Sequence, residues 1–399
     1  MKHLILFPGI LIFLSISCNR IEDPVHMPVF RNGEGGFACY RIPAVITAPN
    51  GDILAFAEAR RHSCADFGNV NIVMRRSSDN GSSWDDMTVV AFYDTLQAGN
   101  AAPVTDMMDP RFPGGRIFMF YNTGNNHEYQ VRTGEGYREV WYVTSLDNGH
   151  SWSDPVNITS QVHRPFMPEA SPEYVFEEDW RAYANTPGHA LQLTRKFPGR
   201  ILVPANHSAG NPDPDAIFDD YRAHAFYTDD HGETFQISEP VDVKSSNEAT
   251  AAELSDGRLM QNMRLQNGSR KYRIVAVSSD GGASWDTTYI DTMLPDPVCQ
   301  GSIIDMDHRR KGHLLLFSNL DSQDERENLT VRLSYDDGAS WPVARRIYAG
   351  SSAYSDLVIQ QDGKAGLLFE RGTDDGGKYF EEGGGVFYTN FDLRWLTRQ

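Results

Sequence analysis

The sequence predicts an all-β protein built as a six-bladed β-propeller, and three observations lead to this fold class. One turn motif, Ser/Thr-x-Asp-x-Gly-x-Ser/Thr-aromatic, occurs five times along the chain. Each copy follows a short run rich in Val, Ile, Tyr and Phe, which are residue types that favour strands. No segment of the sequence shows a sustained apolar period of 3.6 residues, so we expect little helix.

The five motifs predict hairpin turns, one for each successive repeat. Their aspartates are 68, 83, 50 and 56 residues apart, and a repeat of roughly 50 residues with one hairpin is typical of a propeller blade. Asp and Ser can bind the local backbone, Gly can adopt a positive φ, and we expect the aromatic ring to pin each turn onto its own sheet. We therefore interpret the motifs as structural rather than as metal or sugar sites. The aspartates are Asp79, Asp147, Asp230, Asp280 and Asp336, and the strand-like runs before them are 71–76, 139–144, 223–227, 272–277 and 329–333.

The length of the chain predicts the sixth blade. About 375 residues follow Met27, enough for five blades that carry the motif and one formed by the two ends of the chain. Two polar insertions, at 122–136 and 161–185, are expected to shape the mouth of the central channel. No linker rich in Ser, Pro or Gly divides the chain, so we predict one domain over residues 29–399.

The composition restricts the possible ligands. Of 399 residues, 54 are acidic and 36 are basic, which gives a net charge of −18, and 40% are hydrophobic. A disordered or collagen-like chain is excluded by the hydrophobic fraction. A nucleic-acid binder is not expected, because no basic stripe is visible. An anionic ligand would have to be bound by a local cluster of arginines.

The first 28 residues read as a targeting segment and a tether. Eleven mostly apolar residues, Leu4 to Leu14, are too few to span a bilayer but suit a signal peptide over residues 1–17. The small residue before Cys18 is typical of a bacterial lipoprotein cleavage site. Cleavage there would make Cys18 the first residue and leave residues 18–28 as a tether. We expect an exported protein, either a periplasmic, outer-membrane or cell-surface lipoprotein held through a lipid on Cys18, or a soluble secreted form. We expect it to be a monomer.

The cysteines and histidines predict neither a disulfide framework nor a metal site. Three cysteines remain after Cys18, at 39, 64 and 299, and none forms a Cys-x-x-Cys pair. The histidines show no ligand spacing, and His189 and His207 read as polar core or loop residues. We therefore expect no cofactor and no essential metal.

The segment Cys39-Tyr40-Arg41-Ile42-Pro43, together with the five turn motifs, carries a family resemblance. From about Val29 to its end the chain resembles the exo-α-sialidase (neuraminidase) glycoside hydrolases, which have a Phe/Tyr-Arg-Ile-Pro motif, several Asp boxes and a six-bladed propeller. The resemblance implies a sialidase-like fold and sialylated glycans as substrate.

The resemblance also implies three arginines that bind the carboxylate of sialic acid. Arg41 matches the first, Arg264 the second and Arg326 the third. A planar guanidinium that is always charged pairs bidentately with a carboxylate, so a convergent set could overcome the negative field of the chain. Each arginine taken alone reads as a surface ion pair. Arg332 is the alternative to Arg326, and we expect it to support packing instead.

The resemblance also implies roles for Arg60, Glu58 and Asp66. Arg60 corresponds to a residue near the 4-position, with Glu58 as a possible partner. Asp66 corresponds to the catalytic carboxylate on a mobile loop, and it would act first as general acid and then as base. Read without the family, Asp66 is a turn-forming residue before Phe-Gly.

The nucleophile in this family is a tyrosine rather than a carboxylate. The anomeric carbon of sialic acid bears its own carboxylate, so an anionic attacker is repelled and a neutral phenol is not. A phenol has a pKa near ~10 and requires an adjacent base. Tyr354 matches the nucleophile and Glu248 the base, although Glu-Ala-Thr-Ala stands where many relatives have Glu-Cys/Ser-Gln-Val. Glu253 is the rival base, and its odd offset would put it on the opposite face of the strand.

Two further residues complete the predicted site. Glu370 resembles a glutamate that braces the first arginine and would hold Arg41 in the orientation that substrate needs. Asn100 stands where relatives line the N-acetyl pocket.

The sequence therefore predicts a retaining exo-α-sialidase that releases terminal sialic acid. A trans-sialidase, including an intramolecular one, shares the same residues and stays open. A non-catalytic sialic-acid-binding propeller predicts the loss of Asp66, Tyr354 or Glu248, and all three are present.

Overall fold

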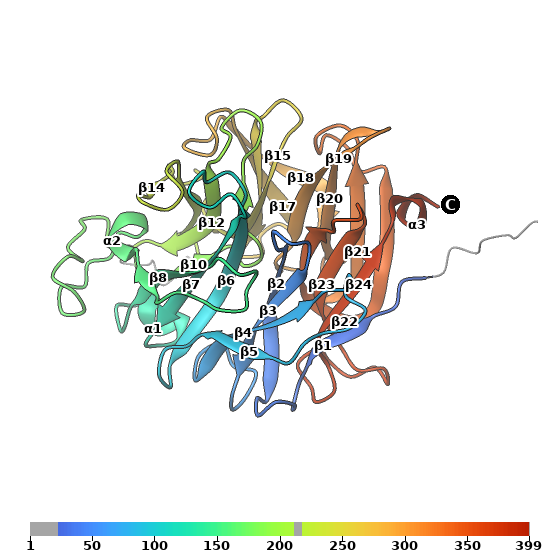
Figure 1. The fold of residues 1–399 in the computed structure, drawn as a ribbon. Coiled ribbons are helices and arrows are strands. Elements are labelled where there is room, and N and C mark those ends of the chain that lie inside the picture. Colours follow the sequence, from blue (N-terminus) through green and yellow to red (C-terminus); the bar gives the residue numbers. More distant parts are fainter. Residues whose placement is uncertain (1–22, 211–217, 399) are drawn as a thin grey trace, which may run out of the picture.

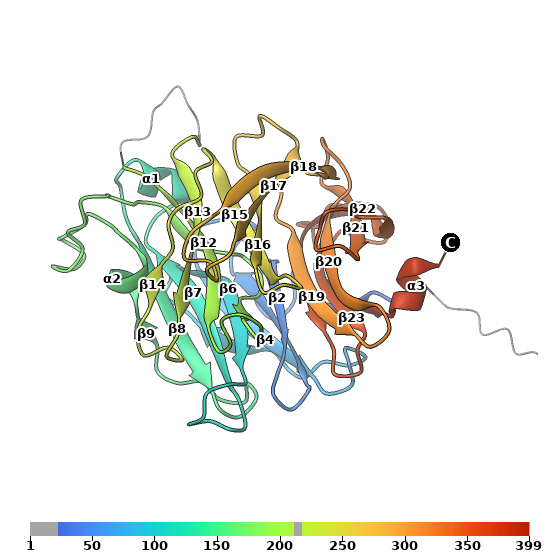
Figure 2. The same ribbon diagram turned by 90° about the horizontal axis from the view of Figure 1, so that it is seen from above.

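The computed structural model describes residues 23–210 and 218–398. The predicted signal peptide, Cys18 and the first part of the tether lie outside the described residues. The regular secondary structure of the described chain is almost entirely β-strand, arranged around a central axis (Figures 1 and 2), so the predicted all-β propeller is confirmed. Its first strand, β1 (Met27–Arg31), begins two residues before the predicted start of the domain.

The strands of residues 23–210 and 218–398 group into six antiparallel blades, which we number I to VI. In blades I to IV each blade is built from consecutive strands. Blade I contains β2 (Cys39–Thr47), β3 (Ile53–Arg60), β4 (Val70–Ser77) and β5 (Thr88–Ala91), and blade II contains β6 (Gln97–Asp106), β7 (Arg116–Gly124), β8 (Arg138–Ser145) and β9 (Val156–Asn157). Blade III contains β10 (Tyr183–Asn185), β11 (Leu191–Gln192), β12 (Ile201–Ser208), β13 (Tyr221–Thr228) and β14 (Gln236–Ile237). Blade IV contains β15 (Ser246–Glu253), β16 (Leu259–Leu265), β17 (Tyr272–Ser278) and β18 (Thr287–Pro295).

The last two blades share a strand, and the two ends of the chain close the ring. The 17-residue strand β22 (Val343–Ile359) is the outer strand of blade V and continues as the inner strand of blade VI. The N-terminal β1 pairs with β24, so it supplies the outer strand of blade VI, as predicted from the length (Figure 1). The other strands are β19 (Ser302–His308), β20 (Gly312–Leu320) and β21 (Glu327–Ser334) in blade V, and β23 (Ala365–Arg371) and β24 (Gly385–Phe391) in blade VI.

The five repeated turns have the same hydrogen bonds. In the first copy the Ser77 hydroxyl accepts a bond from the Gly81 amide at 2.8 Å, and Asp79 accepts bonds from the amide and hydroxyl of Ser83. Two consecutive residues in each copy have positive φ, for example Asn80 at 59° and Gly81 at 87°. The aspartate thus stabilises a turn whose second positive-φ residue is glycine. Any residue with a Cβ at that position would be strained.

The turns pack against the preceding blade as well as against their own sheet, on which Phe235 lies beside Phe226 and Trp341 beside Phe317. The Trp84 ring of blade I lies 5.3 Å from the Tyr388 ring of blade VI, in a T-shaped pair. A Cβ added at Gly81 would overlap the same Tyr388 ring. In the other four copies the glycine of the motif likewise lies against a side chain of the blade before it: Gly149 on Leu54, Gly232 on Phe118, Gly282 on Leu202 and Gly338 on Met260. The repeats therefore join neighbouring blades.

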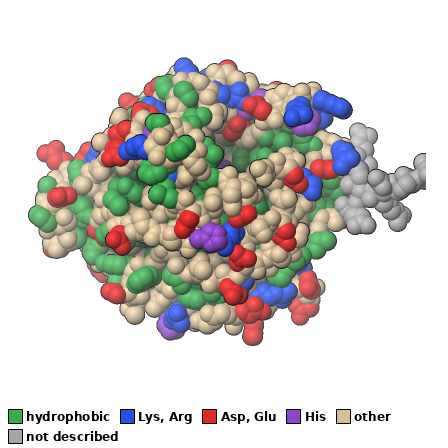
Figure 3. Space-filling model, in the orientation of Figure 1, with side chains coloured by type: hydrophobic (Ala, Val, Ile, Leu, Met, Phe, Trp, Pro, Cys, Tyr) green, Lys and Arg blue, Asp and Glu red, His purple; other side chains and the backbone are tan. Residues whose placement is uncertain are grey.

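Helices are few and short, as expected. They are α1 (Glu128–Arg132), which lies within the predicted insertion 122–136, α2 (Thr159–Val162), and α3 (Leu393–Thr397) beside blade V. In the described ranges, no helix is long and apolar enough to cross a membrane. On the face in Figure 3, acidic and basic side chains are interspersed rather than gathered in a basic stripe.

Candidate active site

A pocket at the mouth of the central channel brings together the residues that the sequence singled out. Eight of the nine predicted residues line it: Arg41, Arg60, Asp66, Asn100, Glu248, Arg264, Arg326 and Tyr354. The ninth, Glu370, is fully buried directly behind Arg41. They come from five different blades, so the closed ring is required to assemble them.

Local backbone irregularities aim several of these side chains. In the inner strand of four blades the pairing register shifts at a pocket residue: between Arg41 and Ala44, around Asn100, around Glu248, and around Tyr354. Ile42 and Asn100 adopt left-handed φ values of 56° and 55°. Such bulges bend a strand and redirect a side chain, so each inner strand turns one functional group into the mouth.

Glu370 on β23 fixes the first arginine. Its two carboxylate oxygens accept bonds from Arg41 Nε and Nη2, both at 3.2 Å. The same carboxylate accepts a bond from the Ile42 amide at 2.9 Å. Burial acts to lower the pKa of Arg41, but Glu370 and nearby phenols outweigh it and raise that pKa. This bidentate pair leaves Arg41 Nη1 pointing into the pocket, where it lies 3.4 Å from Asp66.

Arg60 and Glu58 hold the loop that carries Asp66. Arg60 Nη2 lies 2.7 Å from Glu58, and Arg60 Nη1 donates to Asp66 at 2.8 Å and to the Cys64 carbonyl at 2.7 Å. Burial acts to raise the pKa of Asp66, but Arg60 and then Arg41 outweigh it, so that the pKa is lowered. The side chain is nevertheless 69% exposed. Asp66 is therefore an ionised carboxylate that substrate can reach from solvent.

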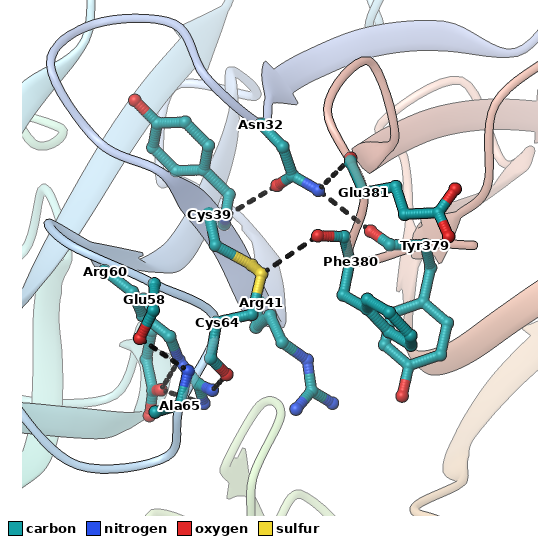
Figure 4. The surroundings of a disulfide bond; sticks show 12 residues. Asn32, Cys39, Arg41, Glu58, Arg60, Cys64, Ala65, Tyr379, Phe380 and Glu381 are labelled. Carbon is teal, nitrogen blue, oxygen red and sulfur yellow. Dashed lines mark hydrogen bonds and ion pairs between the residues drawn. A yellow bond between two sulfur atoms is a disulfide. The ribbon is translucent and has the colours of Figure 1, made fainter. Parts of the chain in front are cut away.

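A disulfide joins Cys39 to Cys64, which the cysteine count did not predict (Figure 4). The pairing of β2 with β3 puts Cys39 opposite Arg60, and Cys64 follows Arg60 by four residues. The two cysteines therefore come close, with 5.2 Å between their Cα atoms. The sequence predicted no disulfide framework and left a single pairing of these cysteines open, because sequence spacing alone does not reveal a pair formed across a hairpin. The bond ties the base of the Asp66 loop to the strand that carries Arg41. Cys299 is free and buried.

Tyr354 and Glu248 are in direct contact at the floor of the pocket. The phenol of Tyr354, on β22, donates a short hydrogen bond to Glu248, on β15. Arg264 Nη1 lies 2.6 Å from the other oxygen of Glu248 and 3.1 Å from the phenol oxygen. Burial raises the pKa of Tyr354 well above its ordinary value, and the Glu248 charge adds to this shift. The phenol is thus neutral and already paired with a carboxylate that can take its proton.

Arg326 faces the same tyrosine from the loop before β21. Its guanidinium carbon lies 5.9 Å from the Tyr354 ring centre, and that of Arg41 lies 5.3 Å from it. Arg326 donates to the Val298 carbonyl at 3.0 Å and to the Tyr379 hydroxyl at 3.4 Å. No carboxylate of the described residues forms an ion pair with it, so its charge is available to a ligand.

The two alternatives weighed in the sequence lie outside the pocket. Arg332 is buried in β21 and donates to Asn319 and Asp321, both at 2.7 Å. Glu253, at the end of β15, accepts bonds from the backbone of Thr194 and Arg195. Both side chains therefore form hydrogen bonds within the propeller and do not line the pocket.

Sequence reasoning missed several pocket residues. Glu128, Arg138 and Tyr221 also line the cavity. Outside this lining, the Tyr379 ring contacts Arg41, with 5.2 Å between the guanidinium carbon and the ring centre. Glu128 lies on α1, so the predicted insertion 122–136 was the signal available for this residue. Asn100 contacts the site through its backbone, because its amide donates to Glu58 at 2.9 Å.

One group of possible metal ligands lies away from the pocket. Asp106, Asp109 and His231 have ligand atoms within 4.8 Å of one another. Arg116 Nη2 lies 3.0 Å from Asp109 and 3.7 Å from Asp106. A cation thus already balances this cluster, and it forms a link between blades II and III.

The chain is similar to known proteins over most of its length. A family model described as a BNR repeat-like domain matches residues 51–367. A sialidase from Micromonospora viridifaciens is 35% identical over 390 residues, which cover 92% of this chain and 53% of that protein, so the chain spans about half the length of this relative. An exo-alpha-sialidase from Arthroderma benhamiae is 28% identical, with 90% of this chain and 85% of that protein covered.

Solved structures show the same fold. An intramolecular trans-sialidase from Ruminococcus gnavus superposes with a TM-score of 0.74 at 16% identity, and the match covers 94% of this chain and 98% of that one. A Hadza microbial sialidase gives a TM-score of 0.75 at 24% identity, covering 92% of this chain and 68% of that one. The chain belongs to the BNR repeat-like domain family, and it is similar to sialidases over most of its length.

Proposed function

We propose that the protein is a retaining exo-α-sialidase, which hydrolyses terminal sialic acid from glycoproteins, glycolipids and oligosaccharides through a tyrosine nucleophile. The observation that carries the proposal is the contact between the Tyr354 phenol and Glu248, placed between the guanidinium groups of Arg41, Arg264 and Arg326. Three cations around one phenol suit a sugar whose anomeric carbon bears a carboxylate.

In the first step the Tyr354 oxygen bonds to the anomeric carbon while Glu248 takes the phenol proton. Asp66 gives a proton to the glycosidic oxygen, and the bond from that oxygen to the anomeric carbon breaks. In the second step Asp66 takes a proton from water, the water oxygen bonds to the anomeric carbon, and the tyrosine oxygen leaves and regains its proton from Glu248. Two displacements at one carbon retain its configuration.

Asp66 must hold a proton to act as the acid, although it is ionised in the free protein. Its pKa is lowered by Arg60 and Arg41. A substrate carboxylate bound to Arg41 would neutralise part of that positive charge and raise the pKa of Asp66. Substrate binding would thus prepare the acid for the step that needs it.

A fluorogenic sialoside assay on the wild type and on Tyr354→Phe tests the proposal, with NMR of the released sugar. We expect the wild type to release the α-anomer first, and Tyr354→Phe to lose at least 1,000-fold in kcat. Tyr335→Phe is the matched control, because Tyr335 is exposed in a turn of blade V. Full activity in Tyr354→Phe would remove the nucleophile assignment. An anhydro sugar or a transferred product would assign a trans-sialidase instead.

We also propose that the protein acts outside the cytoplasm as a monomer and is held to a membrane only by a lipid on Cys18. The support is the signal-like segment of residues 1–17 followed by Cys18. Metabolic labelling with a fatty-acid probe tests this proposal, with Cys18→Ala as the variant. Labelling that persists in Cys18→Ala would contradict it, and release of unlabelled wild type into the medium would assign the secreted form.

A further inference from the structure

Arg326 is held differently from the other two arginines of the predicted carboxylate site. Arg41 and Arg264 each pair with a glutamate. Arg326 Nη2 donates instead to the Val298 carbonyl at 3.0 Å, and its Nη1 donates to the Tyr379 hydroxyl at the longer distance of 3.4 Å. The orientation of the Arg326 guanidinium therefore depends on where a backbone carbonyl is placed.

The residue that supplies this carbonyl has an unfavourable backbone conformation. Val298 has a φ of 61°, which lies in the left-handed region that β-branched residues rarely adopt. It follows Pro297, and turns that need a positive φ after a proline favour glycine or asparagine at that position. Such a conformation persists only where the surrounding structure fixes it. The bend at Val298 therefore requires support from its neighbours.

A buried ion pair supplies this support. Arg273, on β17, is fully buried, and its Nη1 atom lies 3.2 Å from Asp296 Oδ2. The same Nη1 atom donates to the Cys299 carbonyl at 2.5 Å, and Asp296 Oδ1 accepts a bond from the Cys299 amide at 2.8 Å. Arg273 Nε donates to the side-chain oxygen of Asn262 at 2.7 Å, which fixes the guanidinium on blade IV. Arg273 and Asp296 thus hold both ends of the 296–299 bend.

The position of this pair separates it from the substrate. Neither Arg273 nor Asp296 lines the pocket. Their side chains are 0% and 3% exposed, and a buried ion pair gives back much of its attraction as lost hydration. Its bonds to the backbone of the bend indicate that the pair fixes a conformation rather than adding much net stability.

We propose that Arg273 and Asp296 are positioning residues for substrate binding, an inference that rests on the proposed function. They hold the bend at Val298, and the Val298 carbonyl aims the Arg326 guanidinium at the carboxylate of the sugar. Contacts that begin on blade IV, at Arg273, thereby orient a ligand-binding group in the loop before β21 of blade V.

A pair of ligands that differ only in the carboxylate separates this role from a general loss of structure. The glycal 2-deoxy-2,3-didehydro-N-acetylneuraminic acid carries the sugar carboxylate but has no leaving group, and its methyl ester has no charge there. Calorimetric titration of wild type and Asp296→Asn with both compounds measures the affinities. We expect Asp296→Asn to weaken binding of the acid about 10-fold, since a hydrogen bond between charged groups is misaligned, and binding of the ester less than about 2-fold.

The loss should disappear once Arg326 is removed. In the Arg326→Met background, Asp296→Asn should change the affinity for the acid by less than about 2-fold, because both substitutions act on one interaction. Asp229→Asn is the matched control and should bind both ligands like wild type, since Asp229 pairs with Arg200, another buried arginine that does not line the pocket. Equal losses on acid and ester, or an undiminished loss in the Arg326→Met background, would overturn the inference.

Glycine at position 298 tests the role of the bend. Glycine adopts a positive φ without strain, so Asp296→Asn/Val298→Gly should regain affinity for the acid to within about 3-fold of wild type. Arg273→Lys is the milder variant should Asp296→Asn fail to fold, because it keeps a cation beside Asp296. It should show the same preference for the acid at a smaller loss. A double variant as weak as Asp296→Asn would overturn the route through Val298.

Two results separate this inference from the proposed function. A wild type that binds the acid but cleaves no sialoside would refute the proposed function, and the titrations would still decide the inference. A wild type that cleaves sialosides, beside an Asp296→Asn variant that binds the acid equally well, would refute the inference alone.

Discussion

Asp356 and His189 meet across the central channel, with 2.7 Å between the Asp356 Oδ1 and His189 Nδ1 atoms. Asp356 lies on the inner strand of blade VI, two residues after Tyr354, and it is fully buried. It also accepts bonds from the Val45 amide of blade I at 2.8 Å and from the Ser302 hydroxyl of blade V at 2.8 Å. One carboxylate thus connects four blades directly below the pocket.

We predict that Asp356→Asn lowers both stability and turnover. Replacing a buried carboxylate that pairs with His189 should cost about 3 kcal/mol of unfolding free energy. The strand that carries Tyr354 loses its fixed position, so kcat should fall more than KM rises. Urea unfolding and steady-state kinetics measure the two effects. Asp362→Asn in the exposed turn after β22 is the control, and equal behaviour of the two variants would contradict the role given to Asp356.

The same pair predicts a pH dependence of stability. Burial acts to lower the pKa of His189, but Asp356 outweighs it and the pKa is raised. A group whose pKa is raised by folding contributes stability that is fully present below its unfolded pKa of about 6.5 and is lost as pH rises through the folded pKa. Wild type should therefore lose unfolding free energy above about pH 6.5, and Asp356→Asn should lose less. A parallel decline in both proteins would refute this assignment.

Removing the carboxylate behind Arg41 should weaken substrate binding. In Glu370→Gln the guanidinium keeps its charge but loses the bidentate pair that orients it. We expect KM for a sialoside to rise about 10-fold or more, since a hydrogen-bonded charge pair is broken. Glu381→Gln, in the exposed loop before β24, serves as the control. An unchanged KM in Glu370→Gln would show that Arg41 is oriented by other contacts.

The disulfide should matter for both stability and the acid loop. Its two cysteines are 25 residues apart, and closing a loop of that length stabilises a fold by about 3 kcal/mol. We expect the double variant Cys39→Ser/Cys64→Ser to lose roughly this amount and to show a lower kcat, because the loop of Asp66 is no longer tied to the strand of Arg41. Cys299→Ser keeps the bond and is the comparison. Wild-type kcat in the double variant would show that Arg60 alone positions Asp66.

The contact between repeated turns and the preceding blade can be isolated with two glycines. Gly81 and Gly363 have φ values of 87° and 80°, but a Cβ at 81 would overlap Tyr388, whereas nothing lies within 4 Å of a Cβ at 363. Alanine costs backbone strain at both positions. We expect Gly81→Ala to lower the melting temperature clearly more than Gly363→Ala. Equal shifts would mean that the turns do not join the blades.

The sequence predicted the fold and most of the site, since both depend on local signals. The repeated turns are short motifs whose hydrogen bonds lie within one copy. Arg41 and Tyr354 lie in segments that resemble a family, and that resemblance also supplied Arg264, Arg326 and Glu248. The structure brings all of these residues to one pocket. Their catalytic roles stay predictions.

What the sequence did not reveal depends on relationships between distant segments. The pairing of Cys39 with Cys64 follows from the register of β2 on β3, which no spacing rule supplies. The direction in which Trp84 packs follows from the placement of one blade beside another. Glu128 lies in the predicted insertion 122–136, but its contact with Tyr221 of blade III could not be read from the sequence.

The use of β1 as the outer strand of blade VI pairs this early strand with β24, far along the chain. Strand β24 ends at Phe391, so the ring cannot close until the chain has been synthesised through this strand. A precursor that emerges from the ribosome therefore keeps an open edge at its final blade. Such an incomplete ring has no assembled pocket. The pocket side chains, which come from at least five blades, reach their relative positions only when the ring closes.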